Sequence, residues 1–144
     1  MRGDDAAALS RLEEYFEAGG ACAEAYRALG EILLDRNETA GAEDAFERAA
    51  RADAVFPGVH LGLAQLAASH GDGKRAASEL AREIALDPDS PLAYLEMGLV
   101  HERLLGDAGG AAAWYARCKE HGGTDEMIAA QRTAGGAAAG RGGA

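Results

Sequence analysis

Apolar residues recur along most of the chain with the spacing of an amphipathic α-helix. Between residues 91 and 105, Tyr94, Met97 and Val100 follow at three-residue steps and share one helix face. There is no sustained alternation of β-branched and polar residues, the signal for strands. The pattern predicts an all-α protein. The expected helices cover 5–18, 22–36, 39–53, 57–70, 73–86, 91–105, 108–121 and 124–133.

The helical pattern repeats three times, in copies that start at residues 23, 57 and 91 and are therefore 34 residues apart. The eighth position of each copy is small, and the fourth is aromatic or His. Later in each copy a second small residue is followed by a large one after four positions. The small residues are Gly30, Ala64 and Gly98, then Ala42, Ala76 and Ala111, and the large ones are Phe46, Leu80 and Tyr115.

These motifs resemble the tetratricopeptide repeat family. Tyr26-Arg27-Ala28-Leu29-Gly30, Ala42-Glu43-Asp44-Ala45-Phe46 and Tyr94-Leu95-Glu96-Met97-Gly98 carry the resemblance. It implies a right-handed α-solenoid of three helix-turn-helix repeats with an extra N-terminal helix and a short C-terminal capping helix. The expected units are 1–22 (N-terminal helix, possible half repeat), 23–56, 57–90 and 91–123 (repeats), 124–133 (cap) and 134–144 (disordered Gly/Ala tail).

The third copy departs from the pattern by one extra residue, because Gly106-Asp107 arrives one step later than Gly71-Asp72. Its second helix is therefore expected to be shifted, with Trp114 beside the position where the family has its aromatic residue. At the chain's C-terminal side, Thr124 is expected to be the N-cap of the capping helix.

The resemblance also implies a concave groove lined by the first helix of each repeat. In such proteins the second, fifth, ninth and twelfth repeat positions point into the groove. On this chain those positions are Glu24, Arg27, Glu31 and Leu34, then Gly58, Leu61, Gln65 and Ala68, then Leu92, Leu95, Leu99 and Glu102. The strip is charged at one end and apolar at the other. The residues predicted to contact a partner are Arg27, Glu31, Leu34, Leu61, Gln65, Leu92, Leu95, Leu99 and Glu102.

Two interpretations remain open for Leu95 and Leu99, which lie four residues apart on a second apolar face of their helix. They either line the groove or pack against a neighbouring helix or the C-terminal cap. In the first case, replacing both leucines by Glu abolishes partner binding and leaves helix content intact. In the second case, the same change unfolds the protein.

One subset of this family grips the C-terminal carboxylate of chaperones with a clamp of lysines and asparagines. This chain lacks the clamp. Arg27 can stand in for the first cation, but Glu31 and Gly62 replace asparagines, and Leu92 and Glu96 replace the final cations. A partner that presents an apolar or amphipathic segment, such as a helix, fits the sequence better.

Composition narrows the classes of partner and compartment. The formal net charge of -10 disfavours nucleic acid, because an acidic protein repels phosphates. No run of apolar residues is long enough to cross a membrane, so membrane insertion is not expected. Two cysteines without framework spacing, Cys22 and Cys118, and the absence of a signal-peptide pattern favour the cytoplasm. The Ala, Gly and Arg bias suggests a GC-rich genome and thus a bacterial source.

Catalytic chemistry is not indicated by the sequence. The histidines His60 and His101 fall at packing positions, and His70 and His121 fall near helix ends, where they complement the helix dipole. Cys118 and His121 alone are too few for a metal site. No enzyme activity, cofactor or metal is therefore predicted.

The sequence favours a protein-protein interaction module, such as an adaptor, scaffold or assembly factor, that binds an apolar or amphipathic segment. The alternatives are a substrate-specific chaperone of the secretion type and a scaffold that self-assembles through its solenoid ends. Binding of an unfolded client segment, and a gene beside that client, would distinguish the chaperone. Light scattering over a range of concentrations would detect the homo-oligomer.

Overall fold

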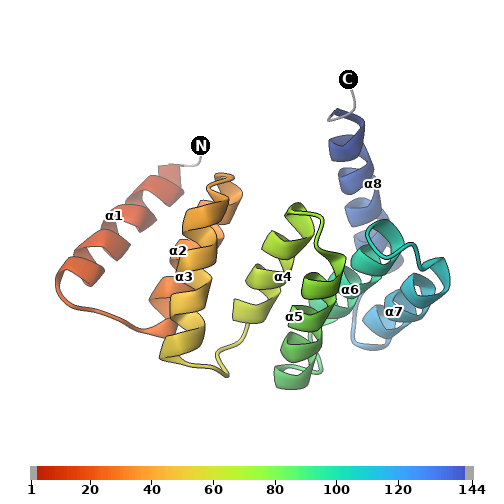
Figure 1. Ribbon diagram of the computed structural model, residues 1–144, viewed down its shortest axis with the longest axis horizontal. Helices are drawn as coiled ribbons and strands as arrows, with labels where there is room; N and C mark the ends of the chain where they lie inside the picture. The colour runs from red at the N-terminus through yellow and green to blue at the C-terminus, as the bar shows by residue number, and fades with distance from the viewer. Residues whose placement is uncertain (1–2, 142–144) are drawn as a thin grey trace.

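The computed structural model describes residues 3–141, and the side chains of residues 3–134. This part of the chain forms helices without strands, arranged as a row of antiparallel pairs (Figure 1). The helices are α1 (Gly3–Glu17), α2 (Ala23–Asp35), α3 (Thr39–Ala52), α4 (Val59–Ser69), α5 (Gly73–Leu86), α6 (Pro91–Arg103), α7 (Ala108–Glu120) and α8 (Asp125–Arg141). The prediction of an all-α fold is confirmed, and all but one of the helix ends lie within two residues of their expected positions.

Glycine lets the two helices of a repeat approach each other closely. A Cβ atom on Gly30 of α2 would lie 2.8 Å from the ring of Phe46 in α3. On Gly98 of α6 it would lie 2.3 Å from the ring of Tyr115 in α7. Phe46 is fully buried, which is the close packing expected when a large side chain fills the space that a glycine leaves. The repeat motif thus encodes the contact inside each pair.

The extra residue of the third copy is accommodated in a loop. Residues 104–107 separate α6 from α7, whereas residues 70–72 separate α4 from α5. Because the loop takes up the additional residue, Tyr115 packs against Gly98 as Phe46 packs against Gly30. Trp114 lies beside this position, as expected, and its ring is 6.2 Å from that of Tyr94.

Short polar side chains begin several helices. The Asp72 Oδ1 atom accepts the backbone N–H of Arg75 at 3.0 Å, and the Asp107 Oδ1 atom accepts that of Gly110 at 2.9 Å. At α8, the Thr124 hydroxyl accepts the N–H of Met127 at 3.1 Å, which confirms Thr124 as the N-cap. Each cap satisfies an N–H group that the helix itself leaves unpaired.

The first turn of α4 is capped by a side chain from another helix. Its N-cap, Gly58, has φ 87° and no side chain to offer. Instead Glu83 of α5, which is 3% exposed, accepts the N–H of Gly58 at 2.7 Å and that of Leu61 at 3.3 Å. This buried carboxylate ties the two helices of the second repeat together at one end.

The first helices of the repeats form an inner layer. α4 contacts both α2 and α6 directly, in addition to its own partner α5. Closer spacing on one side of a helical array makes that side concave. The inner face formed by α2, α4 and α6 is therefore the surface on which the groove was predicted.

The last helix is longer than the sequence predicted. α8 continues to Arg141, whereas the sequence predicted a cap that ends at 133 and a tail from 134. Four of residues 134–141 are Ala, which favours helix, and three are Gly, which disfavours it, whereas extending an existing helix needs no new nucleus. In Figure 1 the end of α8 projects beyond the other helices. Residues 142–144 lie outside the described part.

Candidate partner-binding surface

A shallow cavity of about 130 Å³ lies on the inner face, between α4 and α6. Apolar side chains form most of its wall, and two charged groups, Glu96 and Arg103, complete it. The apolar members are Ala68, Leu99, Val100 and Leu104. Leu99 and Val100 are buried, whereas Leu104 is exposed at the opening. The cavity can therefore offer apolar contact to a side chain that enters from the concave side.

Glu96 brings a largely buried carboxylate to this cavity. Its Oε1 atom accepts a hydrogen bond of 3.4 Å from the Nε2 atom of Gln65, which links α6 to α4. Burial raises the pKa of the Glu96 carboxyl above its usual value. The hydrogen bond from Gln65 and the charge of Arg103 oppose that rise.

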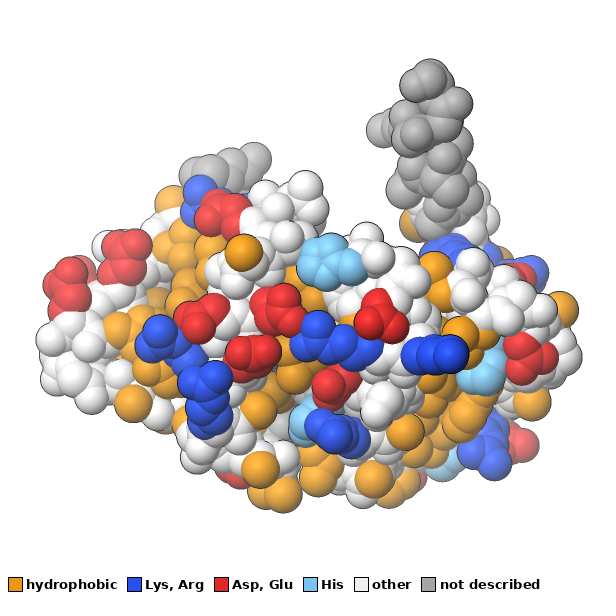
Figure 2. All heavy atoms as spheres, viewed as in Figure 1, with side chains coloured by type: hydrophobic (Ala, Val, Ile, Leu, Met, Phe, Trp, Pro, Cys, Tyr) orange, Lys and Arg blue, Asp and Glu red, His pale blue; other side chains and the backbone are white. Residues whose placement is uncertain are grey.

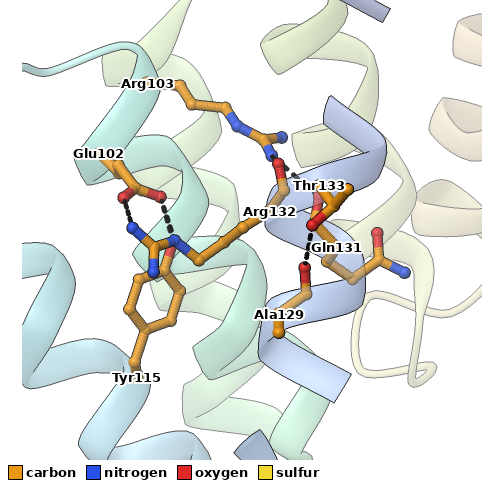
Figure 3. A network of polar contacts seen from close by, with 7 residues as sticks. All are labelled: Glu102, Arg103, Tyr115, Ala129, Gln131, Arg132 and Thr133. Atoms are coloured by element: carbon orange, nitrogen blue, oxygen red, sulfur yellow. Dashed lines mark hydrogen bonds and ion pairs between the residues drawn. The ribbon is translucent and has the colours of Figure 1, made fainter. Parts of the chain in front are cut away.

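Arg103, at the rim of the cavity, is directed toward α8. Its guanidinium donates from one nitrogen, Nη2, to the backbone carbonyl oxygens of Gln131 and Arg132, at 2.9 and 3.0 Å (Figure 3). The contact holds α8 against the end of α6. It also gives the Arg103 guanidinium partners that are distinct from Glu96.

Leu95 and Leu99 lie beneath α8. Leu95 is 0% exposed and Leu99 is 7% exposed, and they form one buried cluster with Tyr94, Cys118 of α7 and Ile128 of α8. The structure therefore decides between the two interpretations: Leu95 belongs to the core under the cap, and its assignment to an open groove is corrected. Leu99 belongs to the same cluster, although it also borders the cavity.

A polar network also links α6, α7 and α8 (Figure 3). Glu102 of α6 accepts the hydroxyl of Tyr115 at 2.8 Å and pairs with the guanidinium of Arg132 in α8. Hydrogen bonds from Arg132 and Tyr115 lower the pKa of Glu102. Burial and the neighbouring Glu102 charge raise the pKa of Tyr115. Glu102, predicted to contact a partner, is thus occupied by the cap.

The other residues that were predicted to line the groove differ in their exposure to solvent. Arg27 and Glu31 form an ion pair along α2, and Leu34 and Leu61 are partly buried against the core. Leu92 is 37% exposed. The structure brings Gln65 and Leu99 close to one cavity and leaves the α2 residues apart from it. Their contact with a partner stays a prediction.

Sequence reasoning missed Glu96, Val100, Arg103 and Leu104 as members of this surface. Glu96 was noted only as a departure from the carboxylate clamp, yet it lies at the cavity. The available signal is a carboxylate flanked by Leu95 and Met97, in a helix that is apolar on two faces. Such a carboxylate is either exposed to solvent or buried with hydrogen bonds or ion pairs to neighbouring side chains, and periodicity alone does not distinguish the two cases.

The ion pairs of α3 and α5 form a different kind of surface. Arg48 pairs with Asp44 at 2.8 Å, and Arg75 of α5 pairs with Glu43 of α3 at 2.7 Å. Figure 2 shows acidic and basic side chains intermixed across one face of the molecule. Paired, solvated charges of this kind contribute little to stability and give no single-sign patch for steering a ligand.

The family model for the tetratricopeptide repeat matches residues 2–55 and 61–123. The chain belongs to the tetratricopeptide repeat family. The first of these matches includes α1, and the second covers most of α4 and all of α5 to α7. The interpretation of α1 as a half repeat stays a prediction. Among curated proteins, no sequence matches the chain.

Solved structures of tetratricopeptide repeat proteins have the same fold. A crystal structure of MamA is 25% identical, has a TM-score of 0.73 and is matched over 83% of this chain and 69% of its own. A second MamA crystal structure has the same TM-score and is matched over 64% of its own chain. The Sgt2 domain from Aspergillus fumigatus is 23% identical, with a TM-score of 0.68 and coverage of 77% and 75%. The fold is therefore that of a tetratricopeptide solenoid.

Membership in this family makes the chain a protein-protein interaction module, a role that is typically not enzymatic. Within residues 3–141, none of the helices is long and apolar enough to span a bilayer. Over the described side chains, no three His, Cys, Asp or Glu residues gather in a way that could hold a metal ion.

Proposed function

We propose that this tetratricopeptide repeat protein is an adaptor or assembly factor that binds a segment of a partner protein on the concave face of α2, α4 and α6. The observation that carries the proposal is the cavity between α4 and α6, which combines apolar walls with one carboxylate and, at its rim, one guanidinium. A cavity of about 130 Å³ admits one side chain, and a single anchoring side chain gives sequence preference.

This cavity favours an adaptor over a secretion-type chaperone. A chaperone for unfolded clients needs a continuous apolar strip, and Leu95 is removed from such a strip by α8. Recognition of one side chain in a confined site suits a defined segment better. The two free cysteines, one exposed and one buried, agree with a cytoplasmic location, because thiols stay reduced there.

The test begins with a tagged full-length chain expressed in the native host, followed by identification of co-purified proteins by mass spectrometry. Affinity for the purified partner is then measured by calorimetry for the wild type and for Ala68→Arg, which fills the cavity from α4. We expect this substitution to weaken binding by about tenfold or more, since it blocks an anchoring pocket.

Ala113→Arg is the matched control, because Ala113 is exposed on α7, outside the inner layer. It introduces the same side chain and should leave affinity unchanged. Circular dichroism checks that both variants keep their helix content. Equal partner affinity for the wild type and Ala68→Arg would show that binding does not use this face, and the proposal would be wrong.

A further inference from the structure

The cavity between α4 and α6 has the size of a single side chain. Its volume is about 130 Å³, well below the roughly 300 Å³ at which pockets for small-molecule ligands begin. Leu99 and Val100 of α6 and Leu104, which directly follows α6, line one side of it, and Ala68 faces them from α4. A side chain that fills this space must therefore have an aliphatic stem.

Glu96 has no direct ionic partner at the cavity within the described part of the chain, although the charge of Arg103, which also lines the cavity, lowers the pKa of the Glu96 carboxyl. The hydrogen bond that Glu96 accepts from Gln65 is long at 3.4 Å. Removing a carboxylate from water is costly when no ion pair compensates it directly, and a cation supplied from outside lowers that cost. Glu96 therefore favours a positively charged group at the end of the aliphatic stem.

The cation already at the rim does not fill this role. Arg103 donates to the carbonyl oxygens of Gln131 and Arg132, so α8 holds its guanidinium at the cap (Figure 3). A ligand cation would thus meet Glu96 without displacing an existing ion pair. The net charge of -10 attracts a basic segment to the molecule as a whole.

We infer that the cavity binds a lysine side chain of a basic, amphipathic partner segment, with its methylene groups on Leu99, Val100 and Leu104 and its ammonium group at Glu96. Lysine fits better than arginine because its charge is compact, whereas the planar guanidinium needs a wider site. This specificity rests on the proposed function, since it requires that a partner segment lies on the concave face. The proposed ligand group is a cation, whereas the clamp of lysines and asparagines binds an anion, the carboxylate.

The inference is tested with peptides selected from a random dodecapeptide library on the immobilised full chain. Selected peptides that contain lysine are synthesised with each lysine in turn replaced by glutamine. Their affinities are measured for the wild type, for Glu96→Gln and for the control Glu13→Gln, whose side chain is exposed on α1. Thermal unfolding confirms that each variant is folded.

We expect one lysine whose replacement weakens binding to the wild type by about tenfold, as hydrogen bonds between charged groups usually do. Binding to Glu96→Gln should be weaker by the same factor, and the lysine replacement should then cause no further loss. Glu13→Gln should behave as the wild type. This coupling would tie the lysine to Glu96 rather than to the overall charge.

Two results would overturn the inference. One is equal affinity of the lysine peptides for the wild type and Glu96→Gln. The other is a loss on lysine replacement that persists in full in Glu96→Gln, which would place the ammonium group at another carboxylate.

Amide signals in NMR spectra distinguish failure of this inference from failure of the proposed function. If either result is found while the peptides shift signals of α4 and α6, only the lysine assignment fails. If no selected peptide shifts those signals, binding to the concave face fails as well.

Discussion

At the scale of single residues, small side chains decide how closely the helices pack. The ring of Tyr115 occupies the space that a side chain on Gly98 would need, and the Tyr115 hydroxyl is fixed by its hydrogen bond to Glu102. The ring therefore cannot move aside without breaking that bond. Gly98 is required by its neighbour, in spite of the low helix propensity of glycine.

We expect Gly98→Ala to lower the free energy of unfolding by about 1–2 kcal/mol, because overpacking outweighs the gain in helix propensity. Urea denaturation measures the change. Gly109→Ala is the control, since the nearest atom to its new Cβ would be 3.9 Å away. That variant should be more stable by about 0.5–1 kcal/mol. Stabilisation by both substitutions would contradict this account of Gly98.

Glu96 is a second residue at which packing and charge compete. Because burial raises its folded-state pKa above the ordinary 4.5, the carboxylate destabilises the fold at pH values above the folded-state pKa. The penalty vanishes below the unfolded-state pKa. Glu96→Gln should therefore raise the free energy of unfolding at about pH 7 and leave it unchanged at about pH 3. Denaturation at several pH values measures this difference, and a variant less stable at neutral pH would contradict it.

At the scale of secondary-structure elements, α8 determines which part of α6 is accessible. Ile128 inserts beside Leu95, Leu99 and Cys118, and the pair of Glu102 with Arg132 closes the contact from one side. Only the first part of α8 makes these contacts, and its end projects away (Figure 1). The helix is a cap whose attachment depends on a few side chains.

The attachment of α8 can be followed through its effect on Cys118. This thiol is 0% exposed, and burial raises its pKa, so it should react slowly, whereas the exposed Cys22 reacts at once. Ile128→Ala removes the apolar contact and should speed the reaction of Cys118 with a thiol reagent by at least about tenfold, since opening of α8 becomes easier.

Gln131→Ala provides the control for that experiment. The Gln131 side chain is exposed, and only its backbone oxygen contacts Arg103. The rate at Cys118 should stay that of the wild type. If Ile128→Ala also leaves the rate unchanged, α8 is not what protects the thiol.

At the scale of the whole molecule, the two ends of the array are closed differently. α1 has no buried residue, and it contacts α2 through the stacking of Phe16 on Tyr26, with ring centroids 4.7 Å apart. α8 instead covers a buried cluster. Because each unit of a solenoid contacts only its neighbours, the contributions of the two ends to stability are separable.

Removing residues 124–144 should therefore destabilise the protein more than removing residues 1–18. The first truncation exposes the buried Leu95, Leu99 and Cys118, whereas the second deletes a helix without buried residues and uncovers Tyr26, which is only partly buried. Thermal unfolding of both truncated chains, with light scattering to detect association, measures the difference. Equal losses of stability would show that α1 contributes more than its contacts indicate.

The sequence by itself determined the repeat, the pairing of helices and most helix ends. These features follow from local rules: the spacing of apolar residues, the small residues at Gly30 and Gly98, and caps such as Asp72. Each rule involves residues close in the chain or one repeat apart, so periodicity carries the information. The all-α solenoid could be predicted for that reason.

The tertiary structure decided which side of α6 faces solvent. Leu95, Leu99 and Glu102 occupy positions that the repeat pattern assigns to a groove, and α8 covers them with Ile128 and Arg132. A helix that is apolar on two faces does not reveal which neighbour covers each face. That depends on where the last helix docks, and docking is set by contacts about thirty residues apart in the chain. The same docking engages Arg103 with α8 and leaves Glu96 at the cavity without an ion pair in the described part of the chain.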